Sequence, residues 1–412
     1  MKKRIFLKAP LLTRSGYGEQ ARFLLRALRS REELFDIFIQ PLEWGKTSWI
    51  SEVTEERQWI DETIEKTIAY LQQGGQFDAS IQVTIPNEWE KLAPINIGYT
   101  AGIETTKVAA PWLQRGNDMD SIIVVSSHSK NTYEKTVYTA ENPQTKHQTE
   151  YRLTTPITTV NFPIKKYDTY PDVDLELEYD FNFLVMAQMG PRKNVGNTIK
   201  WFIEEFRNEE VGLVLKTNMA KNCLLDREKV YHDFRRLVER QGPRKCKMYL
   251  LHGDMEDNEV HSLYLHPQIK AVLSLTHGEG FGLPLFEAAY SEVPVIAPGW
   301  SGQLDFLVNR KTGKTEFFNV EYDLQPIPEQ VVWEGVIIKE SMWAYPREHS
   351  AKQKMRECYA NYEEAQQQAA TLAARVTVEF REEKQNEQMV NVICDALGIN
   401  SVQQDEQIVE FG

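Results

Sequence analysis

Two glutamates, Glu279 and Glu287, stand eight positions apart around a glycine-rich turn in the second half of the chain. The segment that holds them, residues 277–287, reads HGEGFGLPLFE. Its three glycines permit a tight turn and a close approach of the backbone to a ligand, and Pro284 suits the first position of a helix. Carboxylates accept hydrogen bonds from hydroxyl groups. One glutamate could therefore bind a sugar while the other reaches a ribose.

The same turn also predicts a phosphate site. It follows a buried strand that we predict over residues 271–275, and a helix opens directly after it. The N–H groups of Gly282 and Leu283 would then be free, and they would lie at the positive end of the helix dipole. A diphosphate fits this arrangement. The alternative is an ordinary strand-to-helix connection with solvated glutamates.

Short apolar runs alternate with helix-period stretches along the chain, which is typical of parallel sheets with helices on both faces. A length of 412 residues suits two domains of roughly 150 to 200 residues each. The predicted strands are residues 4–8, 35–40, 79–84, 95–100, 121–126, 183–186, 211–215, 248–251, 271–275 and 293–297. Residues 324–349 break the period, and residues 351–375 and 377–397 are predicted as two helices.

We predict an N-terminal Rossmann-like domain over residues 1–165, a charged linker over 166–180 and a second Rossmann-like domain over 181–380. Residues 381–412 are expected to form a helix that packs back on the first domain. Ligands in such open sheets bind beyond the carboxyl ends of the strands. The site is therefore expected between the two domains.

The segment from Glu279 to Glu287, continued through residues 288–303, resembles the Glu-x7-Glu element of the family-4 retaining glycosyltransferases. Other motifs match in the same order over most of residues 1–400. The resemblance implies an α/β chain with the GT-B fold, in which two facing Rossmann-like domains with parallel sheets enclose an interdomain cleft. It also implies a hexosyl- or pentosyltransferase that moves a sugar from a nucleotide-diphosphate sugar, UDP- or GDP-linked, to a hydroxyl acceptor with retention of configuration.

Basic residues in the second half resemble the loop with which this family holds the donor diphosphate. Arg192 and Lys193 follow the predicted strand 183–186, and Lys193 is the stronger candidate. The family often has a second cation where Gln188 stands, so the usual pair is incomplete here: either Arg192 compensates or one phosphate contact is lost. Lys216, at the end of another strand, is a further candidate near the nucleotide. Two cations would oppose the charge that develops on the leaving diphosphate without a metal.

The resemblance assigns Glu287 to the ribose, Glu279 to the transferred sugar, and the first amides of the helix to the diphosphate. On the acceptor side, Gly16 and Gly18 resemble the family's glycine loop between donor and acceptor. Glu104 stands where the family usually has an active-site histidine, and it either replaces that histidine or caps a helix.

Composition excludes several other classes of protein. The formal net charge is -13, so nonspecific nucleic-acid binding has no electrostatic support from the whole chain. The four cysteines are scattered without metal-site or disulfide spacing, and no apolar stretch approaches the roughly 18 residues of a membrane span. The start of the chain reads as a buried strand rather than a signal peptide. A cytoplasmic protein fits these features.

The acceptor and the donor base stay open. A glycan, a lipid-linked sugar or another hydroxyl compound would serve as acceptor, and neither a metal nor a cofactor is expected. A DNA-base (hydroxymethylpyrimidine) glycosyltransferase is the alternative enzyme, but its candidate cations are few: Arg14, Lys107, Lys130 and Lys135. A sugar phosphorylase, a nucleotide-sugar epimerase and a non-catalytic sugar-nucleotide-binding module are the remaining alternatives. The oligomeric state is not predicted.

Overall fold

The N-terminal sheet contains six parallel strands in the order β2-β1-β3-β4-β5-β8. Our computed structural model describes residues 2–141, 146 and 148–400. The strands are β1 (Lys3–Ala9), β2 (Phe35–Pro41), β3 (Ala79–Val83), β4 (Ile95–Thr100), β5 (Ser121–Val124) and β8 (Ile157–Thr159). Their inner members are buried almost throughout, as expected where helices cover both faces of a parallel sheet.

The helices of this half are α1 (Gly16–Arg29), α2 (Glu55–Gln72), η1 (Pro86–Glu88), α3 (Ala110–Asn117) and α4 (Ser127–Lys135). The start of α1 is fixed by Ser15, whose hydroxyl oxygen accepts the Gly18 N–H at 2.9 Å. Arg26 and Arg29 in its last turn complement the negative end of the helix dipole. This cap places the glycine loop at the carboxyl edge of the sheet.

The C-terminal sheet repeats the architecture, again with six parallel strands, in the order β11-β10-β9-β12-β13-β14. They are β9 (Asn182–Met186), β10 (Gly212–Lys216), β11 (Lys247–Leu251), β12 (Ile269–Leu273), β13 (Val295–Pro298) and β14 (Phe318–Val320). The helices are η2 (Pro191–Lys193), α5 (Val195–Phe206), α6 (Leu224–Glu239), α7 (Asp257–Leu265), α8 (Leu283–Tyr290) and α9 (Leu304–Leu307). The strand order reverses between β9 and β12, and open α/β sheets bind ligands at such a reversal.

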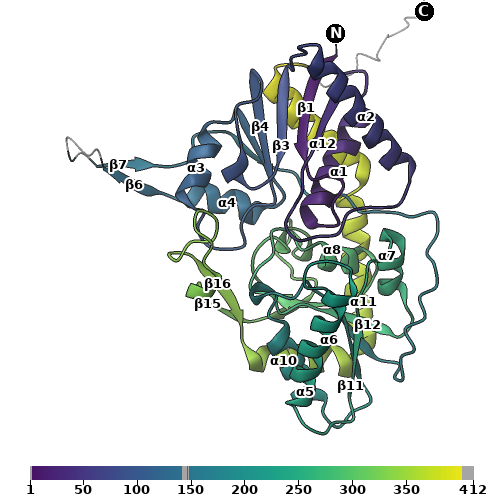
Figure 1. Ribbon diagram of the computed structural model, residues 1–412. Helices are drawn as coiled ribbons and strands as arrows, with labels where there is room; N and C mark the ends of the chain where they lie inside the picture. The colour runs from purple at the N-terminus through teal and green to yellow at the C-terminus, as the bar shows by residue number, and fades with distance from the viewer. Residues whose placement is uncertain (1, 142–145, 147, 401–412) are drawn as a thin grey trace, which may run out of the picture.

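All ten predicted strands are confirmed, each within two residues of its predicted ends. The short edge strands β8 and β14 were not predicted. Residues 160–181, all of them described, carry no helix or strand and connect the two sheets. Figure 1 shows the two sheets, one above the other, with this connection running down one side.

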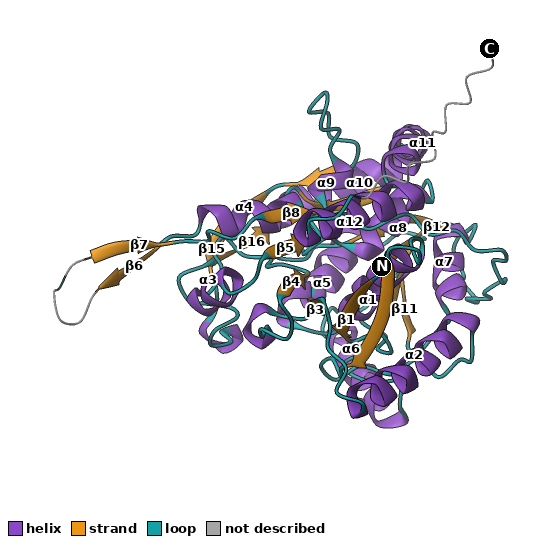
Figure 2. Ribbon diagram, turned by 90° about the horizontal axis from the view of Figure 1, so that it is seen from above, coloured by secondary structure: helices purple, strands orange, loops and turns teal. Residues whose placement is uncertain are grey.

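Two β-hairpins are present in addition to the two parallel sheets. The strands β6 (Tyr138–Glu141) and β7 (Gln148–Tyr151) form an antiparallel pair that projects sideways from the first half (Figures 1 and 2). The strands β15 (Tyr322–Pro326) and β16 (Met342–Pro346) form a second pair within residues 324–349, where we expected irregular structure. That expectation was wrong because strand pairing here uses mixed polar and aromatic side chains with no period. A short helix, η3 (Glu329–Val331), lies between these strands.

The C-terminal region has three helices rather than the predicted two: α10 (Glu348–Ala360), α11 (Tyr362–Glu379) and α12 (Glu382–Leu397). The predicted helix over 351–375 is interrupted at Asn361, whose backbone leaves the helical conformation at φ -118° and ψ 49°. Side chains of α12 pack beside α1 in one apolar cluster, and Figure 1 shows α12 against the first sheet. The last part of the helix predicted over 381–412 lies outside the described residues. No helix in the described part of the chain is long and apolar enough to cross a bilayer.

Replacing Ile393 with alanine tests the packing of α12. Ile393 is fully buried, so Ile393→Ala should lower the free energy of unfolding by about 2–5 kcal/mol, through lost burial and the cavity that remains. Urea denaturation followed by circular dichroism measures the change. Val378→Ala is the matched control, because Val378 is 60% exposed on α11 and should change stability by less than about 0.5 kcal/mol. Equal effects of the two substitutions would contradict the packing described here.

Candidate active site

The strand reversal in the second sheet brings the predicted basic residues to the glycine-rich turn, residues 277–282. Arg192 and Lys193 form the one-turn helix η2 after β9, and the turn follows β12. Because β9 and β12 are neighbours, the two loops meet at the same edge. The His277 N–H donates to the Arg192 carbonyl at 2.8 Å, which joins the loops through their backbones.

Glu279 lies at the centre of the charged groups. Its Oε1 lies 2.6 Å from Lys193 Nζ, and its Oε2 lies 3.1 Å from Arg192 Nη1. The backbone of Glu279 is fixed as well. Its N–H donates to Ser301 Oγ at 2.8 Å, and its carbonyl accepts the Gly302 N–H at 2.9 Å. Glu279 is therefore held by ion pairs at its carboxylate and by hydrogen bonds at its backbone.

Burial and charge act in opposite directions on these groups. Burial alone would keep Glu279 protonated, but Lys193 and Arg192 lower its pKa to about 2. Burial lowers the pKa of Lys193 although Glu279 opposes the change. The pKa of Arg192 is raised, because Glu104 and Glu279 outweigh its burial. Glu279 is thus ionised at neutral pH, and Lys193 is the cation whose charge costs most to bury.

Glu104 reaches this group from the first domain. It lies in the loop after β4, and its Oε1 is 3.4 Å from Arg192 Nε. The Trp300 indole N–H donates to the Glu104 carbonyl at 3.3 Å. Helix α3 begins well beyond it, with Ala109 as its N-cap. The helix-cap alternative for Glu104 is therefore wrong, and its carboxylate faces the basic loop of the other domain.

Glycines let the two domains touch directly. A Cβ atom on Gly278 would lie 2.7 Å from the Glu104 carbonyl oxygen, and one on Gly280 would lie 2.7 Å from that of Ala101. Behind the turn, a Cβ on Gly302 would lie 2.0 Å from the Gly280 carbonyl oxygen. These positions exclude side chains for steric reasons. These glycines therefore allow loops to approach each other closely, in addition to forming the tight turn that the sequence predicts.

Strand β16 fixes both loops of the site at once. The Ala344 N–H donates to the His277 carbonyl at 3.1 Å, and His277 Nδ1 lies 2.8 Å from the Ala344 carbonyl oxygen. Two residues earlier, the Met342 N–H donates to Thr106 Oγ1 at 3.0 Å. Thr106 follows Glu104 by two positions. The loop that carries Glu104 and the turn that carries Glu279 are therefore both bonded to one strand.

Helix α8 begins at the end of the glycine-rich turn. Gly282 is its N-cap with φ 96°, a conformation that favours glycine, and Leu283 is the first helical residue. Pro284 occupies the second position, one later than predicted. The first amides of a helix have no carbonyl partner within it. The amide groups of Gly282 and Leu283 stand at the start of α8, beside Glu279. An anion site requires such N–H groups at a helix start.

Glu287 lies one turn into α8, away from the Glu279 group. Its Oε2 accepts a hydrogen bond from Tyr264 Oη at 2.9 Å. Burial raises the pKa of Glu287 to about 7, against the opposing charge of Lys165 and the Tyr264 bond. At neutral pH this carboxyl is present in both protonation states, so it both accepts and donates hydrogen bonds.

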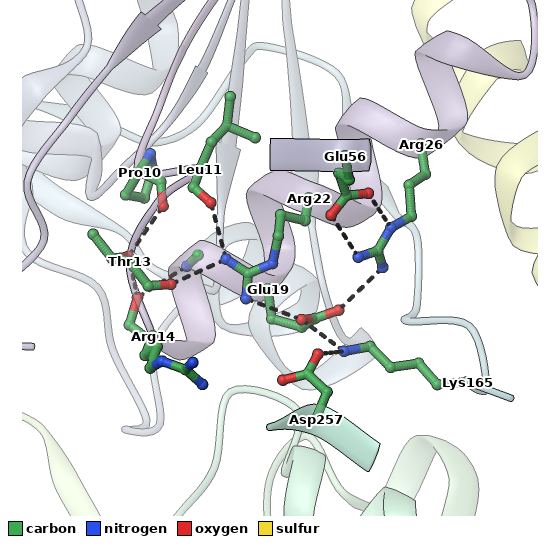
Figure 3. A network of polar contacts seen from close by, with 12 residues as sticks. Pro10, Leu11, Thr13, Arg14, Glu19, Arg22, Arg26, Glu56, Lys165 and Asp257 are labelled. Atoms are coloured by element: carbon green, nitrogen blue, oxygen red, sulfur yellow. Dashed lines mark hydrogen bonds and ion pairs between the residues drawn. The ribbon is translucent and has the colours of Figure 1, made fainter. Parts of the chain in front are cut away.

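A second ionic network crosses between the domains near Glu287 (Figure 3). Lys165, from the connecting segment, lies 2.8 Å from Glu19 on α1 and 3.0 Å from Asp257 on α7. Arg22 and Arg26 also pair with Glu19, at 3.2 and 3.6 Å. Burial opposes ionisation of Glu19, but these cations lower its pKa. One ammonium group thus joins elements of both domains.

The remaining candidates differ in their surroundings. A Cβ on Gly18 would lie 2.0 Å from the Thr13 carbonyl oxygen, whereas one on Gly16 meets nothing within 4 Å. Only Gly18 is therefore required by packing. Lys216 ends β10, and its ammonium donates to the Gly253 carbonyl. Among the described residues it forms no ion pair with the Glu279 group, so the structure does not bring this candidate together with the others.

Solved structures match the chain over almost its whole length. A glycosyltransferase from Rickettsia africae aligns with a TM-score of 0.61 at 13% identity, covering 96% of this chain and 99% of its own. HepE from Anabaena, in complex with UDP-glucose, aligns with a TM-score of 0.59 at 10% identity, covering 95% and 100%. Sucrose-phosphate synthase from Thermosynechococcus elongatus gives 0.59 at 11% identity, covering 96% and 100%. The chain has the GT-B fold. No protein-family model and no curated protein sequence matches it.

The GT-B fold confirms the predicted architecture, whereas the roles of the individual residues stay predictions. Sequence reasoning missed several partners within the GT-B site. Tyr264, which bonds Glu287, belongs to no motif. Ser301 lies within the resembling segment 288–303, but its hydrogen bond to the Glu279 backbone was not predicted. His128, on α4, packs edge-on against Trp300 with the ring centres 4.9 Å apart, and burial lowers its pKa to about 4. It is therefore neutral and structural near pH 7.

The raised pKa of Glu287 predicts a pH-dependent loss of stability. The folded chain holds this proton more tightly than an unfolded carboxyl with a pKa near 4.5. Its contribution to the free energy of unfolding therefore falls as the pH rises from about 4.5 to about 7 and is constant above. Between pH 5 and 8, the wild type should lose about 1–3 kcal/mol relative to Glu287→Gln. Urea denaturation at both pH values measures the difference, and parallel pH curves for the two proteins would contradict the assignment.

Proposed function

We propose that the chain is a retaining, metal-independent glycosyltransferase that moves a sugar from a nucleotide-diphosphate sugar to a hydroxyl acceptor. The observation that carries the proposal is the meeting of Lys193, Arg192 and Glu279 beside the start of α8, at the strand reversal of the second sheet. Two cations and a helix N-terminus suit a diphosphate, and a buried carboxylate suits the hydroxyls of the sugar attached to it.

The basic residues of the site have donors to spare for an anionic ligand, although their charges are already balanced. Arg192 and Lys193 carry two positive charges, and Glu104 and Glu279 carry two negative ones, so the four groups balance without a ligand. An ammonium has three donors and a guanidinium has five. Lys193 and Arg192 could therefore bond phosphate oxygens while they keep Glu279. The positive end of the α8 dipole offsets further negative charge.

In the proposed reaction, the bond between the anomeric carbon of the sugar and the diphosphate oxygen breaks, and a bond from that carbon to the acceptor oxygen forms. The acceptor proton goes to the leaving diphosphate on the same face of the sugar, which retains the configuration. Lys193 and Arg192 stabilise the charge that develops on the leaving group. Glu279 orients the sugar, Glu287 binds the ribose, and Glu104 faces the reacting centre from the acceptor side.

Two further observations bear on the proposal. HepE is solved in complex with UDP-glucose, so uridine diphosphate sugars are the first donors to test, followed by guanosine diphosphate sugars. The cations that a DNA acceptor would use are mostly engaged. Arg14 pairs with Glu52, Lys107 lies 4.0 Å from the centre of the Tyr138 ring, and Lys130 lies 3.8 Å from Glu134. We therefore favour an uncharged acceptor over nucleic acid.

Removing Lys193 should weaken donor binding. A hydrogen bond to a charged group contributes about 1.5–3 kcal/mol, so Lys193→Ala should raise the donor dissociation constant roughly 10- to 100-fold. Donor-induced thermal shifts over a panel of uridine and guanosine diphosphate sugars identify the donor, and calorimetry then measures its affinity. Lys200→Ala is the matched control, because Lys200 is an exposed lysine of the same domain. Unchanged affinity in Lys193→Ala would remove the proposed diphosphate site.

Removing Glu287 should have a separate effect. Glu287→Ala takes away the proposed ribose contact and should weaken binding of the free nucleoside diphosphate as much as that of the intact donor. Glu228→Ala, an exposed glutamate on α6, is the control. Calorimetry with both ligands distinguishes a ribose contact from a sugar contact. Loss of affinity for the intact donor alone would contradict the assignment of Glu287.

Transfer should persist after chelation. In the proposed mechanism Lys193 and Arg192 supply the positive charge, so excess EDTA should leave the rate of sugar transfer by the pure protein unchanged. Loss of activity that is restored by a divalent cation would show the mechanism to be wrong. Proton NMR of the product gives the anomeric configuration in the same assay, and an inverted product would exclude retention. A protein that binds the donor but never releases its sugar would be the non-catalytic module.

A further inference from the structure

Four neighbouring strands of the first sheet each deliver one distinctive side chain to the same edge. In the order β2-β1-β3-β4, the segments that follow carry Trp44 in a loop, Tyr17 in the first turn of α1, Glu88 in η1 and Glu104 in a loop. Carboxyl ends of parallel strands lie along one edge of a sheet. Glu104 already faces Arg192 across the domain boundary. The other three side chains extend the proposed reaction centre into the first domain.

Tyr17 and Trp44 form an aromatic platform at this edge. Their ring centroids are 4.0 Å apart, and the planes are inclined by 36°. The Tyr17 hydroxyl forms a 2.7 Å hydrogen bond with Thr100 Oγ1 at the end of β4. Thr47 Oγ1 donates to the Trp44 carbonyl at 2.8 Å. The Tyr17 ring is therefore held by its hydroxyl and the Trp44 residue by its backbone, and both side chains are partly exposed.

Glu88 adds an unengaged carboxylate to the platform. It ends η1 after β3, it is exposed, and within the described residues its side chain has no hydrogen bond or ion pair. Together with burial, the charges of Glu104 and Glu88 raise the pKa of the Tyr17 hydroxyl, so both lie within electrostatic reach of the ring. The Glu88 carboxylate is thus free to accept hydrogen bonds from a ligand.

We propose that Trp44, Tyr17 and Glu88 form the acceptor subsite and that the acceptor is an uncharged glycan. This inference rests on the proposed function and names the substrate class of its acceptor side. A pyranose ring has an apolar face of C–H groups, which packs against aromatic rings, and a rim of hydroxyls, which donate to carboxylates. The platform and Glu88 offer both kinds of contact within reach of Glu104.

The charges of the subsite decide between a glycan and a nucleic acid. Nucleobases also stack on aromatic rings, so the rings alone do not choose. A nucleic acid needs cations for its phosphates. Glu88 places negative charge at the platform, whereas the charge of Glu104 is already paired with Arg192. Lys8, whose charge acts on Glu88, is itself paired with Glu90 at 3.0 Å. Glu43 and Lys46, which flank Trp44 in the sequence, offset each other. An anionic acceptor is therefore disfavoured, and a neutral polyol is not.

Substitution of Trp44 tests the subsite, with Trp49→Ala as the matched control. Trp49 lies in the same loop and is 44% exposed, and no ring contact to it is found within the described residues. Calorimetric titration with maltose, cellobiose and chitobiose, without donor, identifies a binding glycan. Trp44→Ala should weaken its binding at least tenfold, Trp44→Phe should restore most of the affinity, and Trp49→Ala should leave it unchanged. Equal losses in Trp44→Ala and Trp49→Ala, or no binding of any of the three glycans to the wild type, would overturn the proposal.

Kinetics separate this proposal from the proposed function. Slow hydrolysis of the donor, with water as acceptor, reports the donor site alone. Trp44→Ala and Glu88→Gln should raise the KM for the glycan at least tenfold, whereas Trp49→Ala should change neither that KM nor the rate of donor hydrolysis. A fall in donor hydrolysis in Trp44→Ala would place the ring in the donor site and overturn the subsite. Absence of donor hydrolysis and of transfer in the wild type would count against the proposed function, while the titrations without donor still decide the subsite. Tighter binding of a single-stranded oligonucleotide than of any glycan would also overturn the proposed glycan subsite.

Discussion

The negative charge of Glu279 is held where little water reaches it, and much of the site follows from the need to balance that charge. A buried carboxylate without partners would take up a proton. Lys193 and Arg192 prevent this, so the loop after β9 has to lie against the turn after β12. Arg192 also pairs with Glu104, which ties the balance to the first domain. Removing one member of such a group leaves its partner charged and buried.

The same contacts hold the two domains in position relative to each other. The Glu104 loop belongs to the first domain by sequence, yet Trp300 and β16 of the second domain bond its backbone. On the far side, Lys165 pairs with both α1 and α7. An aromatic pair also joins the two domains: the ring centres of Phe162 and Phe281 are 5.2 Å apart. The position of the Glu104 loop is therefore set largely by elements of the second domain.

Sequence reasoning succeeded where the signal is local. Buried parallel strands appear in the sequence as short apolar runs, and the turn from His277 to Gly282 shows its geometry in its glycines. The architecture and the meeting of Arg192 and Lys193 with this turn were therefore predictable. It failed where the partner is distant in the sequence. Nothing near Glu287 points to Tyr264, and the residues of β16 have no period that indicates a strand between two loops. The helix break at Asn361 was missed although it has a local signal, because asparagine is a favoured helix N-cap and Glu363 and Glu364 follow it in the first turn of α11.

The glycines of the turn have a consequence for how this protein can change over time. Gly278, Gly280 and Gly302 each lie so close to a carbonyl oxygen that even a methyl group would push two loops apart. A substitution there would disturb the charge balance and the domain contact together, so no single compensating change elsewhere repairs it. Core strands tolerate exchange among apolar residues of similar volume. Substitution is therefore tolerated far better in the core strands than at these three glycines.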